Sequence, residues 1–204
     1  MSYKVKEIFY SLQGEGAHSG RPAIFCRFSN CNLWSGKEED RADAVCKFCD
    51  TDFVGGQEYT IEGLVQAISA KWPGGGKPYV ICTGGEPLLQ VDIPLVDALH
   101  VAGFEVAVET NGTVGKHDVA AKLDWVCVSP KADARVKLDR GHELKLVYPQ
   151  TENHPSDFER MAFKHFFLQP CDGVEGSTAM AIDYCLAHPH WSLSLQTHKI
   201  GGFE

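Results

Sequence analysis

Short runs of β-branched and aromatic residues recur along the whole chain, and most of them end in Gly, Pro, Thr or Asn. Runs of this kind are typical of strands. Helix-like segments lie between several of the runs, and alternating strands and helices favour a mostly parallel sheet with crossover helices. We expect strands over residues 5–11, 23–29, 78–83, 105–110, 124–129, 143–148, 165–169 and 192–197.

Three helices are predicted between these strands. Thr60 is placed to cap a helix that runs to about residue 71, a second covers about 93–102, and a third lies between Ser177 and Pro189. Three helices are too few for a complete eightfold barrel. The sequence therefore predicts an α/β fold that forms a partial, open (β/α) barrel with mostly parallel strands.

Composition narrows the class of protein. With 204 residues, of which 44% are hydrophobic and 23% charged, the chain is long enough for one buried core and short for two. We therefore expect a single domain over residues 1–204. The net charge is -8 and the basic residues are scattered, which argues against direct binding of nucleic acid and favours a small-molecule substrate. No run approaches the ~20 apolar residues of a membrane span, and we expect a cytosolic protein with no membrane contact.

Four polar motifs follow strand-like runs: TGGEP (83–87), ETNG (109–112), SPK (129–131) and QPCD (169–172). In parallel α/β folds, ligands bind beyond the carboxyl ends of the strands. Any one of these motifs is also compatible with a turn or a strand stop. Their repetition at the same topological position indicates a binding site at this edge of the sheet.

The cysteines fall into two groups. Four cysteines lie in strand-like or helix-like runs and are expected to be small buried side chains: Cys26, Cys82, Cys127 and Cys185. A different environment surrounds Cys31, Cys46 and Cys49, which share a polar loop over residues 31–49.

Three uses of that loop are open from the residues alone. A structural zinc needs a fourth ligand, such as His18. A thioredoxin-type redox pair has no need of Cys31. A [4Fe–4S] cluster held by three thiolates leaves one iron open to a small molecule.

The C-x14-C-x2-C loop followed by TGGEP resembles the radical S-adenosylmethionine (SAM) superfamily, whose usual spacing is C-x3-C-x2-C. The longer spacing is similar to that of one member family, the 7-carboxy-7-deazaguanine synthases. The resemblance runs from end to end and includes EIFYSLQGEG (7–16), FCRFSNCNLW (25–34), CDT (49–51), CTGGEPLLQ (82–90), FLQPCDG (167–173) and LSLQTHK (193–199).

This resemblance implies two cofactors at the cluster loop. Cys31, Cys46 and Cys49 would hold a [4Fe–4S] cluster whose fourth iron is chelated by SAM. Reductive cleavage of SAM would then release a 5′-deoxyadenosyl radical. Glycines would let the backbone approach the methionine part, and Cys171 would contribute through its backbone rather than as a cluster ligand. The implied SAM-binding residues are Phe48, Cys49, Asp50, Gly84, Gly85, Glu86, Ser129, Pro130, Lys131, Gln169, Pro170, Cys171 and Asp172.

The resemblance also implies a pterin substrate, 6-carboxy-5,6,7,8-tetrahydropterin. Arg27 is suited to the substrate carboxylate because its planar guanidinium binds both oxygens. Glu15 would accept from the guanidine-like edge of the ring, Glu109 would lie near the reacting centre as the catalytic candidate, and Thr51 would bind Mg²⁺. The implied substrate-binding residues are Leu12, Gln13, Gly14, Glu15, Arg27, Thr83, Gln196, His198 and Glu204.

The implied reaction is a radical ring contraction to 7-carboxy-7-deazaguanine with loss of ammonia, on the route to queuosine. A homodimer and an electron donor such as flavodoxin are implied with it. Two alternatives come from other classes: an activase that makes a glycyl radical on a partner protein, and a zinc-stabilised binding module without radical chemistry.

Overall fold

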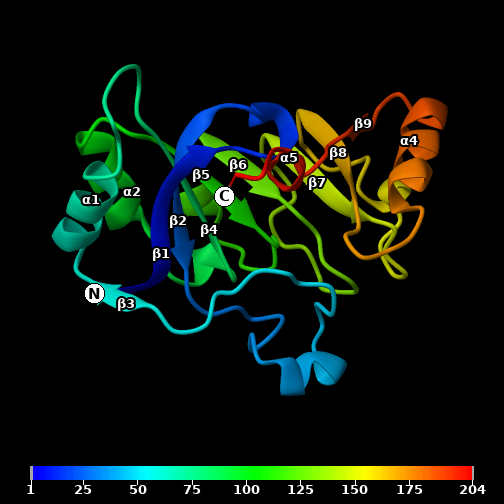
Figure 1. Ribbon diagram of the computed structural model, residues 1–204, viewed down its shortest axis with the longest axis horizontal. Coiled ribbons are helices and arrows are strands. Elements are labelled where there is room, and N and C mark those ends of the chain that lie inside the picture. Colours follow the sequence, from blue (N-terminus) through cyan, green and yellow to red (C-terminus); the bar gives the residue numbers. More distant parts are fainter. Residues whose placement is uncertain (1, 204) are drawn as a thin grey trace.

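A nine-stranded sheet runs through the molecule in the order β3-β1-β2-β4-β5-β6-β7-β8-β9 (Figure 1). The structure is a computed structural model and describes residues 2–203. From β2 to β9 all neighbouring strands are parallel, while β1 is antiparallel to both β2 and β3. The strands are β1 (Tyr3–Leu12), β2 (Pro22–Phe28), β3 (Gln57–Tyr59), β4 (Tyr79–Gly84), β5 (Glu105–Thr110), β6 (Trp125–Val128), β7 (Glu143–Tyr148), β8 (His165–Pro170) and β9 (Ser192–Leu193).

The predicted open, mostly parallel sheet is confirmed, and seven of the eight predicted strands are present close to their predicted bounds. The strand predicted over 192–197 is wrong beyond its first two residues, because β9 ends at Leu193 and Thr197 begins a helix. The three predicted helices correspond to α1 (Ile61–Ser69), α2 (Ile93–Val101) and α4 (Ser177–Ala187). The sequence did not predict β3, α3 (His117–Ala120) or α5 (Thr197–Gly201). Each of these is too short for its hydrophobic period to be visible in the sequence.

Local chemistry fixes the helix ends. The Thr60 side chain accepts a hydrogen bond from the backbone N–H of Gly63 at 3.1 Å, as expected of an N-cap residue. Asp92 caps α2 by accepting from the N–H of Leu95 at 3.0 Å. After α2 the chain turns at Gly103, whose φ of 89° lies in the left-handed region that glycine adopts without steric cost.

Side chains on each strand alternate between two faces of the sheet. Val80 and Cys82 of β4 belong to the main core, which α1 and α2 cover. The intervening Tyr79 and Ile81 belong to a smaller cluster on the opposite face, and Thr83 continues that face into the site described below. One face is therefore used for stability and the other is available for ligands.

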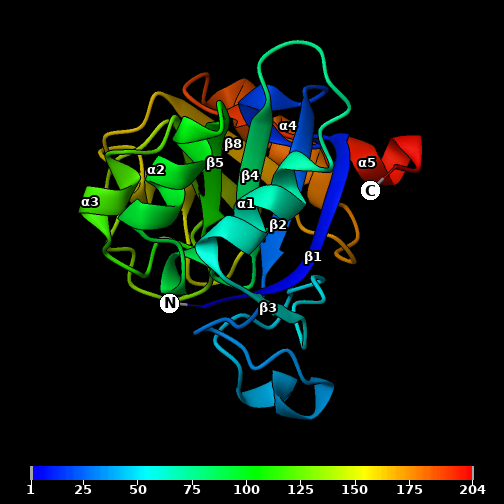
Figure 2. The ribbon, with the colours of Figure 1, turned by 90° about the vertical axis from the view of Figure 1, so that its left-hand side faces the viewer.

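The helices are unequally distributed over these faces. Figure 2 shows α1, α2 and α3 together on one side and α5 beyond β1 on the other. The segment that follows β2, drawn in light blue, projects below the sheet in both views. Within residues 2–203, no helix is long and apolar enough to cross a membrane.

Candidate active site

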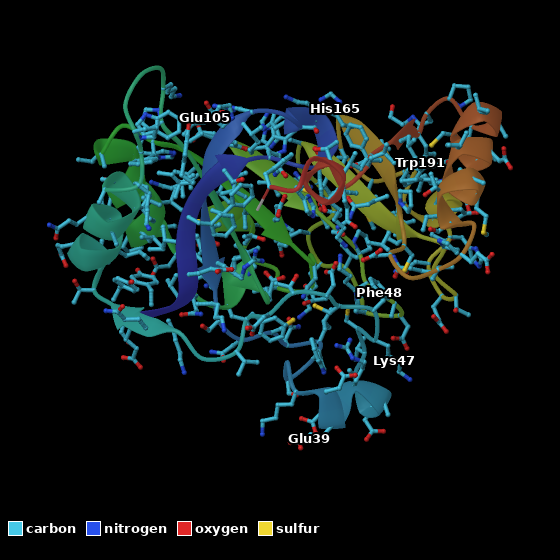
Figure 3. All side chains as sticks on the ribbon, in the orientation of Figure 1. Glu39, Lys47, Phe48, Glu105, His165 and Trp191 are labelled. Carbon is cyan, nitrogen blue, oxygen red and sulfur yellow. The ribbon has the colours of Figure 1, made fainter. Side chains whose placement is uncertain are left out.

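The cysteine loop lies at the carboxyl ends of the parallel strands. Glu105 and His165 begin β5 and β8, and Figure 3 places both at the edge of the sheet opposite Lys47 and Phe48. The edge predicted for the binding site is therefore the edge at which the loop is found.

A cavity of about 470 Å³ opens between the loop and the sheet. It is lined by Cys31, Cys46 and Cys49 and by most of the other residues proposed for SAM or substrate. These are Leu12, Gln13, Gly14, Glu15, Arg27, Phe48, Asp50, Thr51, Thr83, Gly84, Gly85, Glu109, Ser129, Lys131, Gln169, Pro170, Cys171, Asp172, Gln196 and His198. Neither Glu86 nor Pro130 lines it, and Glu204 lies outside the described residues.

The three loop thiols interact with one another. Cys46 and Cys49 share a hydrogen bond, which lowers the pKa of Cys49, and the nearby Lys131 ammonium acts in the same direction against burial. The backbone N–H of Leu33 donates to Cys31 Sγ at 3.4 Å. The same hydrogen bond raises the pKa of Cys46, and burial raises the pKa of Cys31. Cys49 is therefore the loop thiol that ionises most readily.

The described side chains do not form a ready-made site for a single metal ion. Among residues 2–203, no three His, Cys, Asp or Glu side chains converge closely enough to bind one ion. A four-iron cluster places each thiolate on a separate iron, so it needs no such convergence. His18, the fourth ligand considered for zinc, instead hydrogen-bonds Tyr79 at 2.9 Å and packs on Trp125, away from the thiol cavity.

The extra residues between Cys31 and Cys46 form a short 3₁₀ helix, Glu38–Asp43, which braces the loop. Arg41 stacks its guanidinium over the Trp34 ring, 4.1 Å from the centroid. The same guanidinium donates to the carbonyl oxygens of Lys47 at 2.9 Å and Cys49 at 3.0 Å. The long cysteine spacing therefore has a structural function.

The two glycines of TGGEP are required by the chain itself. A Cβ at Gly84 would lie 2.1 Å from the carbonyl oxygen of Phe28, and one at Gly85 would lie 2.1 Å from that of Asn30. The backbone of Glu86 also donates to the carbonyl of Asn30 at 2.9 Å. This close packing ties the end of β4 to the segment that leads into Cys31.

The side chain of Glu86 is used within the fold, which leaves only its backbone carbonyl for the predicted contact with SAM. Its side chain is fully buried and accepts from the backbone N–H groups of Leu88 at 2.9 Å and Asn111 at 2.8 Å, and from Thr110 Oγ1 at 2.7 Å. Burial raises its pKa, and these three hydrogen bonds oppose that rise. The carboxylate holds β4 and β5 together and is not directed at a methionine ammonium group.

The opposite end of the cavity is rich in charge. Lys145 Nζ lies 2.5 Å from Glu15 Oε2 and 3.5 Å from Glu109 Oε1. Burial by itself raises the pKa of Glu15, but the charge and hydrogen bond of Lys145, with a further bond from Gln196, hold it well below its usual range. Glu15 is therefore an ionised acceptor at neutral pH.

Gln169 connects this charged end to the rest of the cavity. Its Nε2 donates to Glu15 Oε1 at 3.1 Å, while its buried Oε1 has no hydrogen-bond partner in the structure. A buried acceptor without a partner is costly, so a ligand N–H or O–H group at this position would be stabilised. The cavity is thus prepared for a polar ligand.

Arg27 lines the cavity but already has a partner. Its Nε donates to Glu7 Oε1 at 2.6 Å, and these two residues are opposite each other in the β1–β2 pairing. The side chain of Arg27 is 21% exposed, and its guanidinium lies 5.8 Å from the Phe9 ring centroid. Glu7 therefore sets the orientation of the guanidinium.

The segment that follows β1 and the segment that leads into α5 meet at the cavity. The backbone N–H and the hydroxyl of Thr197 both donate to the carbonyl oxygen of Gly14 at 2.9 Å, and Gln196 Nε2 donates to Glu15 Oε1 at 2.8 Å. A Cβ at Gly14 would lie 2.3 Å from His198 Nδ1, so the glycine lets α5 approach. The SLQGEG and SLQTHK segments therefore pack against each other and form one wall of the cavity.

Several cavity residues were not predicted. Lys145 is the clearest, and a lysine within the apolar run ELKLVY was a signal for it. Asn111 holds the cysteine loop by donating to Asn32 Oδ1 at 3.2 Å. Cys127 is buried as expected and also contributes to the cavity lining. Cys185 was predicted to be buried, but it is only half-buried.

Lys199 joins the cysteine loop to the end of β8. Its Nζ lies 2.8 Å from Asp50 and 2.7 Å from Asp172, two residues proposed for SAM. No local pattern in the sequence indicates this pairing, because the partners are far apart along the chain.

Comparison with known proteins agrees with this geometry. Residues 42–133 match the family model described as Radical SAM superfamily. The 7-carboxy-7-deazaguanine synthase of Bradyrhizobium diazoefficiens is 59% identical over the full length of both chains. That of Burkholderia multivorans is 55% identical over 98% of each chain. The chain belongs to the 7-carboxy-7-deazaguanine synthase family. A crystal structure titled QueE from Escherichia coli has a TM-score of 0.71 at 25% identity, covering 96% of this chain and 94% of that one.

Family membership confirms the resemblance and the fold. The protein is a radical SAM enzyme, and members of this superfamily use a [4Fe–4S] cluster with SAM. The zinc-module and activase alternatives are not supported, because full-length relatives share the synthase name and not a binding or activase function.

Proposed function

We propose that the protein converts 6-carboxy-5,6,7,8-tetrahydropterin into 7-carboxy-7-deazaguanine with loss of ammonia, on the route to queuosine. The observation that carries this proposal is a single cavity with three thiols at one end and ionised Glu15 beside Lys145 at the other. The thiol end suits the cofactors and the charged end suits a ring rich in N–H groups. The sheet and the loops at its edge supply all of these residues, and we propose that residues 1–204 work as a single domain.

Cys31, Cys46 and Cys49 would hold the cluster at the carboxyl edge of the sheet. When bound, the cluster and SAM supply a radical that abstracts hydrogen from C6 of the pterin, which a protein side chain cannot do. Gly84 and Gly85 would leave room for the methionine part. Phe48, Ser129 and Gln169 are the proposed contacts for the adenosine.

The protein's own contribution to the chemistry is to position the pterin. Arg27, oriented by Glu7, would bind the substrate carboxylate. Glu15 would accept hydrogen bonds from the guanidine-like edge of the ring. Glu109 is held by donors from Gln13 at 2.9 Å and Thr83 at 3.1 Å, which supports its placement near the reacting centre.

A Mg²⁺ ion bound through Thr51 is part of the proposal. Thr51 lines the cavity directly after the cysteine loop, and a Mg²⁺ that keeps most of its waters needs few protein oxygens. Replacing Thr51 by Ala should then reduce the Mg²⁺ dependence of pterin binding without altering the iron content.

The remaining partners follow from the chemistry. An electron donor such as flavodoxin would reduce the cluster, and a cytosolic location would keep its thiolates reduced. A homodimer is proposed from family likeness alone.

An anaerobic assay tests the proposal. Protein reconstituted with iron and sulfide is incubated with SAM, reductant and 6-carboxytetrahydropterin, and the products are separated by mass. The expected product is 7-carboxy-7-deazaguanine, formed together with ammonia. Unchanged pterin in the presence of a loaded, SAM-responsive cluster would contradict the proposed substrate.

A further inference from the structure

Lys145 is a buried cation between two carboxylates of the cavity. It projects from β7, its side chain is only 6% exposed, and its Nζ contacts Glu15 Oε2 at 2.5 Å and Glu109 Oε1 at 3.5 Å. Glu15 comes from the segment after β1 and Glu109 from β5. One ammonium group on β7 therefore joins two acidic side chains from two other parts of the fold.

Both carboxylates are surrounded by donors. Glu15 Oε1 accepts from Gln196 at 2.8 Å and from Gln169 at 3.1 Å. Glu109 accepts from Gln13 on one oxygen and from Thr83 on the other. Since protonation of Glu15 would turn one of these acceptors into a donor, the arrangement around Glu15 requires that its carboxyl group be ionised.

Burial works against that requirement. A carboxylate in a poorly hydrated site is disfavoured unless a positive charge is close to it. The Lys145 charge supplies this compensation for Glu15, and the carboxylates in turn raise the pKa of Lys145 well above its usual value despite burial. The other titratable groups that interact with this cluster are Cys127, Lys131, Glu143 and His198.

The geometry points to Lys145 as a positioning residue that keeps Glu15 ionised and holds the side chains of Glu15 and Glu109 in place, so that they accept hydrogen bonds from N–H groups of the pterin. This inference rests on the proposed function, because it assigns the pterin to the charged end of the cavity. The direct contacts with the substrate do not by themselves require Lys145, so this inference adds a further residue to those needed for binding. Recognition of the ring depends on a cation that need not touch it.

Equilibrium binding of 6-carboxytetrahydropterin under anaerobic conditions tests this role. In K145M, burial would raise the pKa of Glu15, so at about pH 7 affinity should fall at least about tenfold relative to wild type. The deficit should shrink as the pH is raised toward about 9, because the carboxyl ionises again without its lysine. The matched control is K122M, since Lys122 pairs with Asp97 on the surface at 2.6 Å and should bind pterin as wild type does.

Each outcome is decisive. Equal affinity of K145M and wild type at all pH values, or a deficit that does not change with pH, would overturn the inference. If wild type itself does not bind the pterin, the proposed function fails first, and the two failures are thereby distinguished. Should K145M not fold, as judged by thermal melting, K145Q is used with the same criteria, because its amide can donate to Glu15 without carrying charge.

Discussion

The guanidinium of Arg41 donates a hydrogen bond to the carbonyl oxygen of Cys49 at 3.0 Å. Arg41 belongs to the residues that lengthen the cysteine spacing, and Cys49 is a proposed cluster ligand. The residues inserted between Cys31 and Cys46 thus hold the backbone of the segment that follows them. This contact makes the loop a preorganised binding site rather than a flexible one.

Replacing Arg41 by Ala should weaken cluster retention. The change removes two hydrogen bonds to loop carbonyls and the stacking on Trp34, a loss of about 1–3 kcal/mol in loop stability. Iron release to a chelator, followed by absorbance, should be several times faster than in wild type. Arg140, whose side chain is 73% exposed, provides the control, and R140A should release iron at the wild-type rate. Equal rates for R41A and wild type would contradict the bracing role.

Loss of any one loop thiol should prevent cluster loading. In C31A, C46A and C49A one iron lacks its thiolate, so iron and sulfide content after reconstitution should fall to a small fraction of the wild-type value. C185A is the matched control, because Cys185 lies on α4 and packs against the buried side chains of β7 and β8. If all four variants load equally, the ligand assignment is wrong.

Arg27→Ala should weaken pterin binding by roughly 10- to 100-fold, since charge-assisted hydrogen bonds contribute about 1.5–3 kcal/mol. Cleavage of SAM without substrate should be largely retained, because the cluster end is unchanged. Arg21 is a close control: it is also paired with a glutamate, Glu105, at 2.8 Å, but at the opposite edge of the sheet. Normal affinity in R27A would exclude its proposed carboxylate contact.

Glu86→Gln should destabilise the fold by about 1–3 kcal/mol, because an amide has only one acceptor oxygen for the three donors that now reach the carboxylate. The amide N–H group of the new side chain would also face one of these donors. Urea denaturation of the apoprotein measures this loss. E39Q is the control, as the Glu39 side chain is 75% exposed, and its unfolding should match wild type. An unchanged midpoint for E86Q would show that the buried carboxylate is not a structural brace.

Glu15 should make stability depend on pH in the acid range. Its pKa is about 2 in the folded protein against 4.5 for the free side chain, so its contribution is present above about 4.5 and is lost as the pH falls toward 2. Compared with E15Q, the wild-type apoprotein should be more stable near neutrality by on the order of 3 kcal/mol. Thermal melting should show this difference shrinking below about pH 4.5. A difference that stays constant down to about pH 3 would contradict the low pKa of Glu15.

The strand pattern and the edge of the sheet that carries the site could be read from the sequence, because alternation and strand-end motifs are local signals. What the sequence could not show is which polar atoms the protein already uses. Glu86 has the chemistry of an ammonium ligand, yet Thr110 and Asn111 occupy its oxygens. Lys145 has the appearance of a strand lysine, and only the sheet order brings it to Glu109.

The contact between Thr197 and Gly14 also bears on how the enzyme is made. All three loop cysteines leave the ribosome long before Gln196 and Thr197 do. The thiols are therefore available for iron delivery while the wall that these late residues form against Glu15 is still missing. The order of synthesis therefore places the cysteine loop before the segment that completes this side of the cavity.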